Sequence, residues 1–293
     1  RRGGAQGVGA AASWEGIVQG RDVLGPWSGL PAEGADGASL RRVKVAACAE
    51  RAALPRPGDL PPRLWRELSR TQQLACIAAD EAVRQSGLDL PGRDGGDIGL
   101  FLATTVCGMD ISERYYAQYR KNSETADVRL MKRLQPGETG ELLARRYGIG
   151  QAPGLREVCL STCVGSAMAI GAACDAIALG ECEAAIAGGS EALCRVVLSG
   201  FHALKVASPE GCRPFDMNRP GMTVGEGAGM LVLESAEHAR RREALVLGHV
   251  RGFGVTCAAH HLTAPEPTGE QARRAMRDAL LRAGMSPGDI GYI

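Results

Sequence analysis

The stretch that decides the fold reads Glu157-Val-Cys-Leu-Ser-Thr-Cys-Val-Gly-Ser-Ala-Met-Ala-Ile-Gly171. A short apolar stretch with a β-branched residue, as in a strand, ends in two small hydroxyl residues. The thiol of Cys163 follows, and a glycine- and alanine-rich segment typical of a helix then begins. This order predicts a strand-to-helix turn that exposes the sulfur to a ligand. The helix N-terminus directs unpaired N–H groups and its positive dipole end at that sulfur, which favours thiolate over thiol.

The other interpretation of Cys163 is an ordinary core cysteine. The chain has ten cysteines, and a free cysteine commonly behaves as a small buried hydrophobe. Cys163 is set apart by its turn and by the segments downstream. Cys159 and Cys163 are four residues apart with no second pair to match, so we expect no metal site. Core or near-core positions are predicted for Cys48, Cys76, Cys174 and Cys182.

Length and composition describe an ordinary folded chain. Its 293 residues are enough for one large domain or two modest ones, and 45% are apolar. The net charge, 34 basic minus 33 acidic residues, is +1, which gives no argument for a nucleic-acid partner or an acidic membrane surface. Because no long apolar run, secretory signal or disulfide pattern stands out, we expect a cytoplasmic protein with reduced thiols.

Alternating strand and helix patterns predict an α/β architecture with a covered sheet. The expected helix at 164–179 is apolar nearly all round and should be buried. Residues 3–6 are poor strand formers. Strands are expected at 97–105, 157–161, 183–188, 230–234, 244–255 and from 291. Further helices are expected around 14–19, at 69–87, within 112–146 and at 270–283.

Several short segments together resemble one family, the β-ketoacyl-acyl-carrier-protein synthases of the thiolase-like condensing enzymes. The first segment surrounds the thiol of Cys163, and the others follow at the spacing typical of that family. The match runs from about residue 69 to the end of the chain. The matching segments are Ser161-Thr-Cys-Val-Gly-Ser-Ala167, Ala187-Gly-Gly-Ser-Glu-Ala192, Arg213-Pro-Phe-Asp216, Gly225-Glu-Gly-Ala-Gly229, Leu231-Val-Leu-Glu234 and Ala259-His-His-Leu-Thr-Ala-Pro265.

This resemblance implies a thiolase-like fold of two similar α/β halves, layered helices–sheet–helices–sheet–helices. Residues 1–240 are expected to form the first half, and residues 241–293 the opening of an incomplete second half. Members of the family usually form a homodimer through the first halves, and some form a heterodimer with a related subunit.

The family's chemistry gives Cys163 a specific role. The resemblance implies that its sulfur accepts an acyl group as a thioester from acyl carrier protein or acyl-coenzyme A. Malonyl-carrier protein then loses carbon dioxide, and the resulting carbanion attacks that thioester, in fatty-acid or polyketide synthesis. The backbone N–H of Cys163 is expected to donate to the developing oxyanion. No cofactor is implied.

The resemblance also suggests substrate-binding residues. Phe201 and Val106 match residues that line the acyl pocket, and His261 and Thr263 match a loop near the substrate channel. For Phe201, a core aromatic is the other interpretation. The neighbouring His260 is expected to be a surface or structural histidine.

Docking of an acidic carrier protein is predicted for three basic residues. Lys205 matches a docking residue of the family, Arg70 lies in a second matching cluster, and Arg129 belongs to a short basic run. At the second cluster Leu74 and Ala75 replace the expected basic residues. A solvated helix face is the commoner explanation for a short basic run such as the one at Arg129.

One departure bears on activity. The family's two catalytic histidines belong to motifs that the resemblance places after Ile293, and neither His260 nor His261 matches them. Three hypotheses stay open at this point. The chain is part of a decarboxylating condensing enzyme, a non-catalytic truncated or partner subunit, or a thiolase-type acyltransferase that uses coenzyme A. Cys163 disfavours the partner subunit, because such partners usually replace this cysteine. The segments Arg213-Pro-Phe-Asp216 and Gly225-Glu-Gly-Ala-Gly229 disfavour the third hypothesis.

Overall fold

A four-stranded sheet organises the computed structural model, which describes residues 8–27, 44–46, 54–90, 98–149, 155–261 and 263–293. The strand order is β3-β2-β4-β6. The first three strands run parallel and β6 is antiparallel to β4. The strands are β2 (Ile98–Ala103), β3 (Arg156–Cys159), β4 (Ala184–Glu191) and β6 (Gly227–Glu234).

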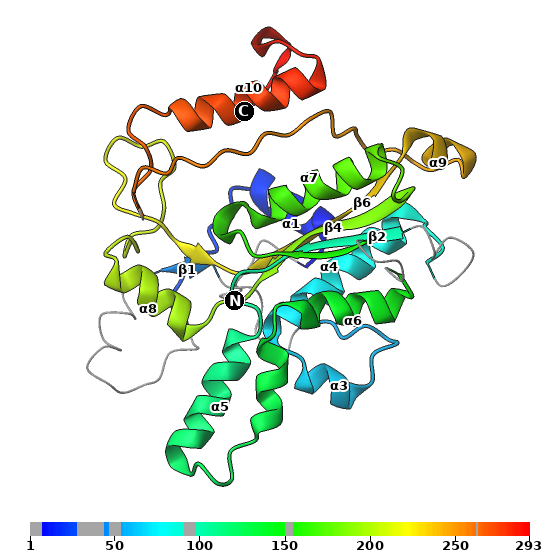
Figure 1. Cartoon of the computed structure of the whole chain (residues 1–293). Coiled ribbons are helices and arrows are strands. Elements are labelled where there is room, and N and C mark those ends of the chain that lie inside the picture. Colours follow the sequence, from blue (N-terminus) through cyan, green and yellow to red (C-terminus); the bar gives the residue numbers. More distant parts are fainter. Residues whose placement is uncertain (1–7, 28–43, 47–53, 91–97, 150–154, 262) are drawn as a thin grey trace.

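Helices cover both faces of this sheet (Figure 1). The helices α4 (Arg70–Ser86) and α6 (Gly137–Tyr147) pack on one face, and α7 (Gly165–Ala178) packs on the other. Leucine and isoleucine side chains fill the first interface, while small side chains fill much of the second. The covered parallel strands confirm the predicted α/β class.

Helix α4 follows its sequence signals closely. The Ser69 hydroxyl accepts from the Gln72 N–H and the Gln72 side chain accepts from the Ser69 N–H, which completes a capping box. Gly87 ends the helix in a left-handed conformation, with φ of 65°. The prediction of a helix at 69–87 is therefore confirmed.

The remaining elements surround this centre. No helix in the part of the chain that the structure describes is long and apolar enough to cross a membrane. A second, two-stranded parallel sheet joins β1 (Val45–Ala46) to β5 (Val224–Gly225). The other helices within the described ranges are α1 (Ala10–Val18), α3 (Pro62–Glu67), α5 (Met109–Lys121), η2 (Val128–Leu134), η3 (Thr162–Val164), α8 (Arg195–Ala203), α9 (Ala236–Arg241), α10 (Glu270–Ala283) and η4 (Pro287–Asp289).

Some predictions concern residues outside the described ranges. The poor strand-forming residues 3–6, Cys48 and Asp97 all lie there. The helix expected around 14–19 is confirmed by α1, and the helical stretches expected within 112–146 are confirmed by α5, η2 and α6. The helix expected at 270–283 is confirmed by α10.

The prediction that α7 is buried all round is wrong. Ala169, Ala173 and Ala176 are buried against the sheet, whereas Asp175 and Ala178 on the other side are exposed. An alanine-rich helix has no polar stripe that would mark its exposed face. The hydrophobicity of α7 therefore does not indicate which side of the helix packs on the sheet.

The strands predicted at 244–255 and from 291 are also absent from the described structure. Residues 244–255 are extended, but no described strand lies beside them to form a ladder. They run between α7 and α10 (Figure 1). Phe253 faces the Gly171 backbone of α7, while Gly252 and Gly254 on the opposite side contact α10. This layering agrees with a thiolase-like arrangement.

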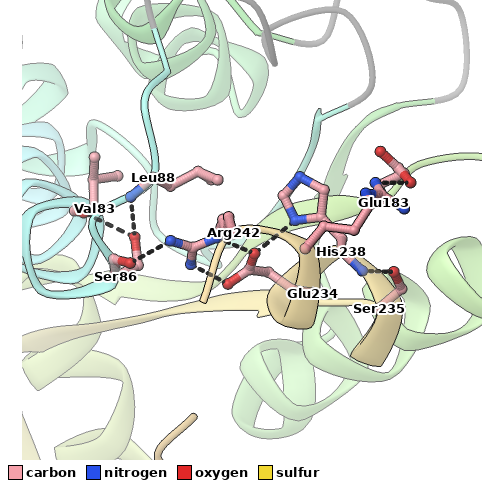
Figure 2. Close-up of polar contacts among 9 residues, drawn as sticks. Val83, Ser86, Leu88, Glu183, Glu234, Ser235, His238 and Arg242 are labelled. Carbon is pink, nitrogen blue, oxygen red and sulfur yellow. Dashed lines mark hydrogen bonds and ion pairs between the residues drawn. The ribbon is translucent and has the colours of Figure 1, made fainter. Parts of the chain in front are cut away.

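A charged network fastens the sheet to two helix ends, at the edge where β6 ends (Figure 2). Glu234, the last residue of β6, receives hydrogen bonds from the guanidinium of Arg242 and lies 2.7 Å from Nδ1 of His238. Arg242 also donates to the carbonyl of Ser86, at the end of α4, over 2.9 Å. Burial raises the pKa of Glu234, but the hydrogen bonds from Arg242 and His238 outweigh it and hold the pKa below its usual value.

Replacing Glu234→Gln should lower the free energy of unfolding by about 2 kcal/mol at pH 7, because His238 stays buried and Arg242 half-buried without the charge they bind. The lowered folded-state pKa makes this contribution complete above the unfolded pKa of about 4.3. It is lost as pH falls through the folded-state pKa. Urea unfolding at pH 7 and in steps down to pH 3 measures both effects. The control is Glu237→Gln in α9, whose side chain is 74% exposed; equal losses at pH 7 would contradict a stabilising network.

Packing of α10 on the extended segment gives a second prediction. A Cβ at Gly254 would collide with the carbonyl oxygen of Ala275, so Gly254→Ala should cost about 1–3 kcal/mol of stability. Gly248→Ala in the same segment is the matched control, because no heavy atom lies within 4 Å of its added methyl group. Thermal unfolding and amide exchange of α10 compare the two. Identical behaviour would show that α10 does not pack on this segment.

Candidate active site

The candidate site lies where three parallel strands end at one edge of the sheet. In the register of the sheet, Ala103 of β2 is the partner of both Cys159 in β3 and Gly189 in β4. The segments that follow these strands therefore leave the sheet close together. Such a carboxyl-terminal edge is the usual place for a ligand in an open α/β sheet.

Cys163 lies on the segment after β3, within the single turn η3 and directly before α7. Its side chain is exposed. A Cβ at Gly165 would contact the Ala103 methyl group at 3.1 Å, so the glycine lets the start of α7 lie against β2. The predicted strand-to-helix turn with an exposed thiol is thus observed.

The residue before the thiol has an unusual backbone. Thr162 has φ of 34°, a left-handed value that is uncommon for residues with a Cβ and rarer for β-branched ones. A conformation of this kind costs free energy and persists where surrounding contacts fix it. The Thr162 carbonyl accepts one such contact, a hydrogen bond of 3.3 Å from the Thr105 hydroxyl.

A carboxylate from the third strand holds the segment after β2. Glu191, the last residue of β4, accepts hydrogen bonds from the backbone N–H groups of Thr105 and Val106, the latter over 3.1 Å. One carboxylate oxygen serves each N–H. The ends of all three strands are thereby linked through Glu191, Thr105 and Thr162.

Three other described thiols, those of Cys76, Cys107 and Cys194, are buried where Cys163 is exposed. Burial raises the pKa of Cys107, and the charge of Glu191 adds to this effect. Burial also raises the pKa of Cys76 and of Cys194 to about 12. Thiolate is the reactive form, so these three positions are suited to packing rather than chemistry.

The predicted acyl-pocket residues are both half-buried. Val106 lies on the loop that Glu191 holds, next to the turn that carries the thiol. Phe201 lies in α8, whose N-terminal Val196 N–H donates to Glu113 of α5 over 2.8 Å. Hydrogen bonds through the loop thus connect Val106 to the turn of Cys163, whereas Phe201 belongs to a helix anchored at α5.

The predicted channel residues form a local turn. Nδ1 of His261 accepts hydrogen bonds from the backbone N–H groups of Thr263 at 3.1 Å and Ala264 at 3.0 Å. Both His261 and Thr263 are exposed. Because Nδ1 is occupied as an acceptor, only the other ring nitrogen of His261 is available to donate to a ligand.

Two of the predicted docking residues are at the surface. Lys205 is exposed just after α8, in a left-handed conformation with φ of 58°. Arg129 is exposed, but its guanidinium binds Asp127 at 2.8 Å, so its charge is already paired locally. A partner with an acidic surface would compete with Asp127 for Arg129.

Arg70, the third predicted docking residue, is largely buried in an ion pair. Its guanidinium forms two hydrogen bonds with Glu226, of 2.8 and 2.7 Å, and its side chain is only 13% exposed. The Glu226 carboxylate, 2% exposed, also accepts from the Leu193 N–H. Leu74 and Ala75 are buried as well. Arg70 therefore joins the start of α4 to the segment after β4, and most of its side chain lies below the surface.

Sequence reasoning missed Glu191 and Thr105. Glu191 belongs to the motif Ala187–Ala192, but the motif alone did not indicate a role for its carboxylate. Within the described ranges, no group of three or more histidine, cysteine, aspartate or glutamate residues is arranged to hold a metal ion.

Comparison with known families agrees with this architecture. The profile described as "Beta-ketoacyl synthase, N-terminal domain" matches residues 3–239. The profile described as "Beta-ketoacyl synthase, C-terminal domain" matches residues 247–293. Because these profiles cover most of the chain, the chain belongs to the beta-ketoacyl synthase family.

Individual relatives support the same assignment. Nodulation protein E of Rhizobium meliloti is 32% identical over 290 residues, which are 98% of this chain and 68% of that protein. The 3-oxoacyl-[acyl-carrier-protein] synthase 2 of Staphylococcus aureus is 34% identical over 236 residues, 78% of this chain and 56% of that protein. A solved structure titled "The ishigamide ketosynthase/chain length factor" superposes with a TM-score of 0.85 at 28% identity, covering 97% of this chain and 68% of its own.

These surroundings predict a ranking of thiol reactivity. With a pKa of about 12, Cys76 and Cys194 are thiolate in only about one molecule in ten thousand at pH 8. Iodoacetamide should therefore alkylate the exposed Cys163 long before either of them. Tandem mass spectrometry of the peptides after timed exposure measures each rate. Comparable rates at Cys163 and Cys194 would contradict the described burial.

Proposed function

We propose that this protein is a condensing acyltransferase in which the Cys163 sulfur carries the acyl chain. One observation carries the proposal: an exposed thiol lies at the strand-to-helix turn of a chain that belongs to the beta-ketoacyl synthase family. The product class is a β-ketoacyl thioester of fatty-acid or polyketide synthesis.

In the first step the Cys163 thiolate attacks the carbonyl carbon of an acyl thioester. A carbon–sulfur bond forms, and the carrier or coenzyme A thiolate leaves after the tetrahedral intermediate collapses. The negative oxygen of that intermediate needs hydrogen-bond donors, and the backbone N–H of Cys163 is the donor that this chain is proposed to supply. The start of α7 favours negative charge at the same point.

In the second step malonyl-carrier protein loses carbon dioxide, and its carbanion attacks the acyl-cysteine carbonyl. The new carbon–carbon bond forms as the Cys163 thiolate leaves, which regenerates the free thiol. The family's histidines stabilise the enolate in this step, and their motifs do not occur within residues 1–293. The second step is therefore proposed for the protein together with those histidines, and only the acylation step is assigned to residues described above.

Partners follow from the same proposal. The name of the Staphylococcus aureus relative includes acyl carrier protein, and exposed Lys205 is the basic residue proposed to dock such a carrier. Acyl-coenzyme A is the alternative donor. Residues 1–240 and 241–293 are proposed as parts of two fold halves, in a cytoplasmic protein that forms a homodimer. A heterodimer with a related subunit is the alternative, since the solved neighbour's title pairs a ketosynthase with a chain length factor.

Intact-mass analysis after incubation with acyl-carrier protein or acyl-coenzyme A tests the covalent role. Wild-type protein should gain the mass of one acyl group, and Cys163→Ala should gain none. Cys212→Ala is the matched control, since Cys212 is also exposed but lies outside the turn. An adduct that persists in Cys163→Ala, or disappears in Cys212→Ala, would overturn the assignment.

A further inference from the structure

We propose that Glu191 is a positioning residue for the acyl-accepting thiol, acting through Thr105 and Thr162. The proposal rests on the proposed function and adds a residue to it. Glu191 itself does not touch the reacting atoms. It holds the loop after β2, and that loop in turn holds the turn on which Cys163 is mounted.

The first link is the pair of hydrogen bonds to the loop. Thr105 and Val106 follow the last residue of β2, so their N–H groups no longer have partners in the strand ladder. Glu191 accepts from both, with one carboxylate oxygen for each. Two bonds to one rigid carboxylate fix both the position and the orientation of this short loop.

The second link joins the loop to the nucleophile turn. The Thr105 hydroxyl donates to the Thr162 carbonyl over 3.3 Å, across 57 residues of sequence. Thr162 has the left-handed backbone noted above, which needs external contacts to persist. Since the Thr162 carbonyl belongs to the peptide unit of the Cys163 N–H, fixing this carbonyl also fixes the direction of the proposed oxyanion donor.

The surroundings of Glu191 distinguish it from an ordinary structural carboxylate. Among the residues that the structure describes, no lysine, arginine or histidine forms an ion pair with it, in contrast to Glu226 beside Arg70. Its carboxylate binds the two loop N–H groups. Val106, held by one of them, is also the residue proposed to line the acyl pocket, so one side chain positions both the thiol turn and a pocket wall.

Glu191→Gln tests this proposal on the protein expressed from its complete gene. Glutamine has the same length but only one acceptor oxygen, and its NH2 group would face a backbone N–H. We expect the rate constants for Cys163 acylation and for its alkylation by iodoacetamide to fall about tenfold or more, since small misplacements of a reacting group are costly. Glu183→Gln, directly before the opposite end of the same strand, is the matched control and should leave both rates within about twofold.

A double-mutant cycle tests the route through Thr105. Thr105→Val removes only the hydroxyl that reaches Thr162, and it should slow Cys163 acylation on its own. If Glu191 acts through this loop, the fold-loss of rate in the double variant will be smaller than the product of the fold-losses of Glu191→Gln and Thr105→Val. Fully multiplicative effects would overturn the proposed route.

Thermal unfolding of the same variants separates positioning from stability. A purely structural role would lower the melting temperature of Glu191→Gln while leaving the Cys163 rates of the folded protein unchanged, and that result overturns the proposal. If Glu191→Gln does not fold, unchanged rates in the exposed Thr105→Val variant would overturn it instead. Failure of the proposed function is distinguishable, because wild-type protein would then gain no acyl group at Cys163 at all.

Discussion

The register of three parallel strands is the constraint on which the candidate site depends. Because Ala103 is aligned with both Cys159 and Gly189, three segments from distant parts of the sequence leave the sheet at one edge. Close approach there requires residues without side chains. A Cβ at Gly189 would overlap the Ser166 hydroxyl and press on the Ala103 carbonyl oxygen at 3.1 Å, so a larger residue here would force the start of α7 to shift.

Strand ends create a second requirement, since backbone N–H groups lose their ladder partners where the strands separate. Two carboxylates meet it at this edge. Glu191 accepts from the loop after β2, and Glu226 accepts from Leu193 while it binds Arg70. Side-chain acceptors allow the chain to bend away from the sheet without leaving buried N–H groups unpaired. The loops after β2 and β4, which lie near the exposed turn at Cys163, thus have hydrogen-bond acceptors for these backbone N–H groups.

The sequence was informative wherever the deciding signals were local. Ser69, Gln72 and Gly87 lie within one helix and define it, and the turn at Cys163 could be inferred from a single run of residues. Pairings across long separations could not be inferred. Residues 244–255 have a strand pattern but no described partner strand, and Arg70 binds Glu226 across 156 residues of sequence. Family resemblance placed Arg70 in a docking cluster without showing which carboxylate would bury it.

Strand β4 connects two edges with opposite demands. Directly before its start, Glu183 pairs with Arg241 beside the network of Glu234, His238 and Arg242, in which each charge has a partner of opposite sign or a hydrogen bond. At its end, Glu191 supports a turn that has a strained Thr162 and an exposed thiol. Its eight residues separate these edges by about 25 Å. Since substitutions so far apart act nearly independently, the closed network can stabilise the sheet while the other edge retains the strain and exposure that a nucleophile needs.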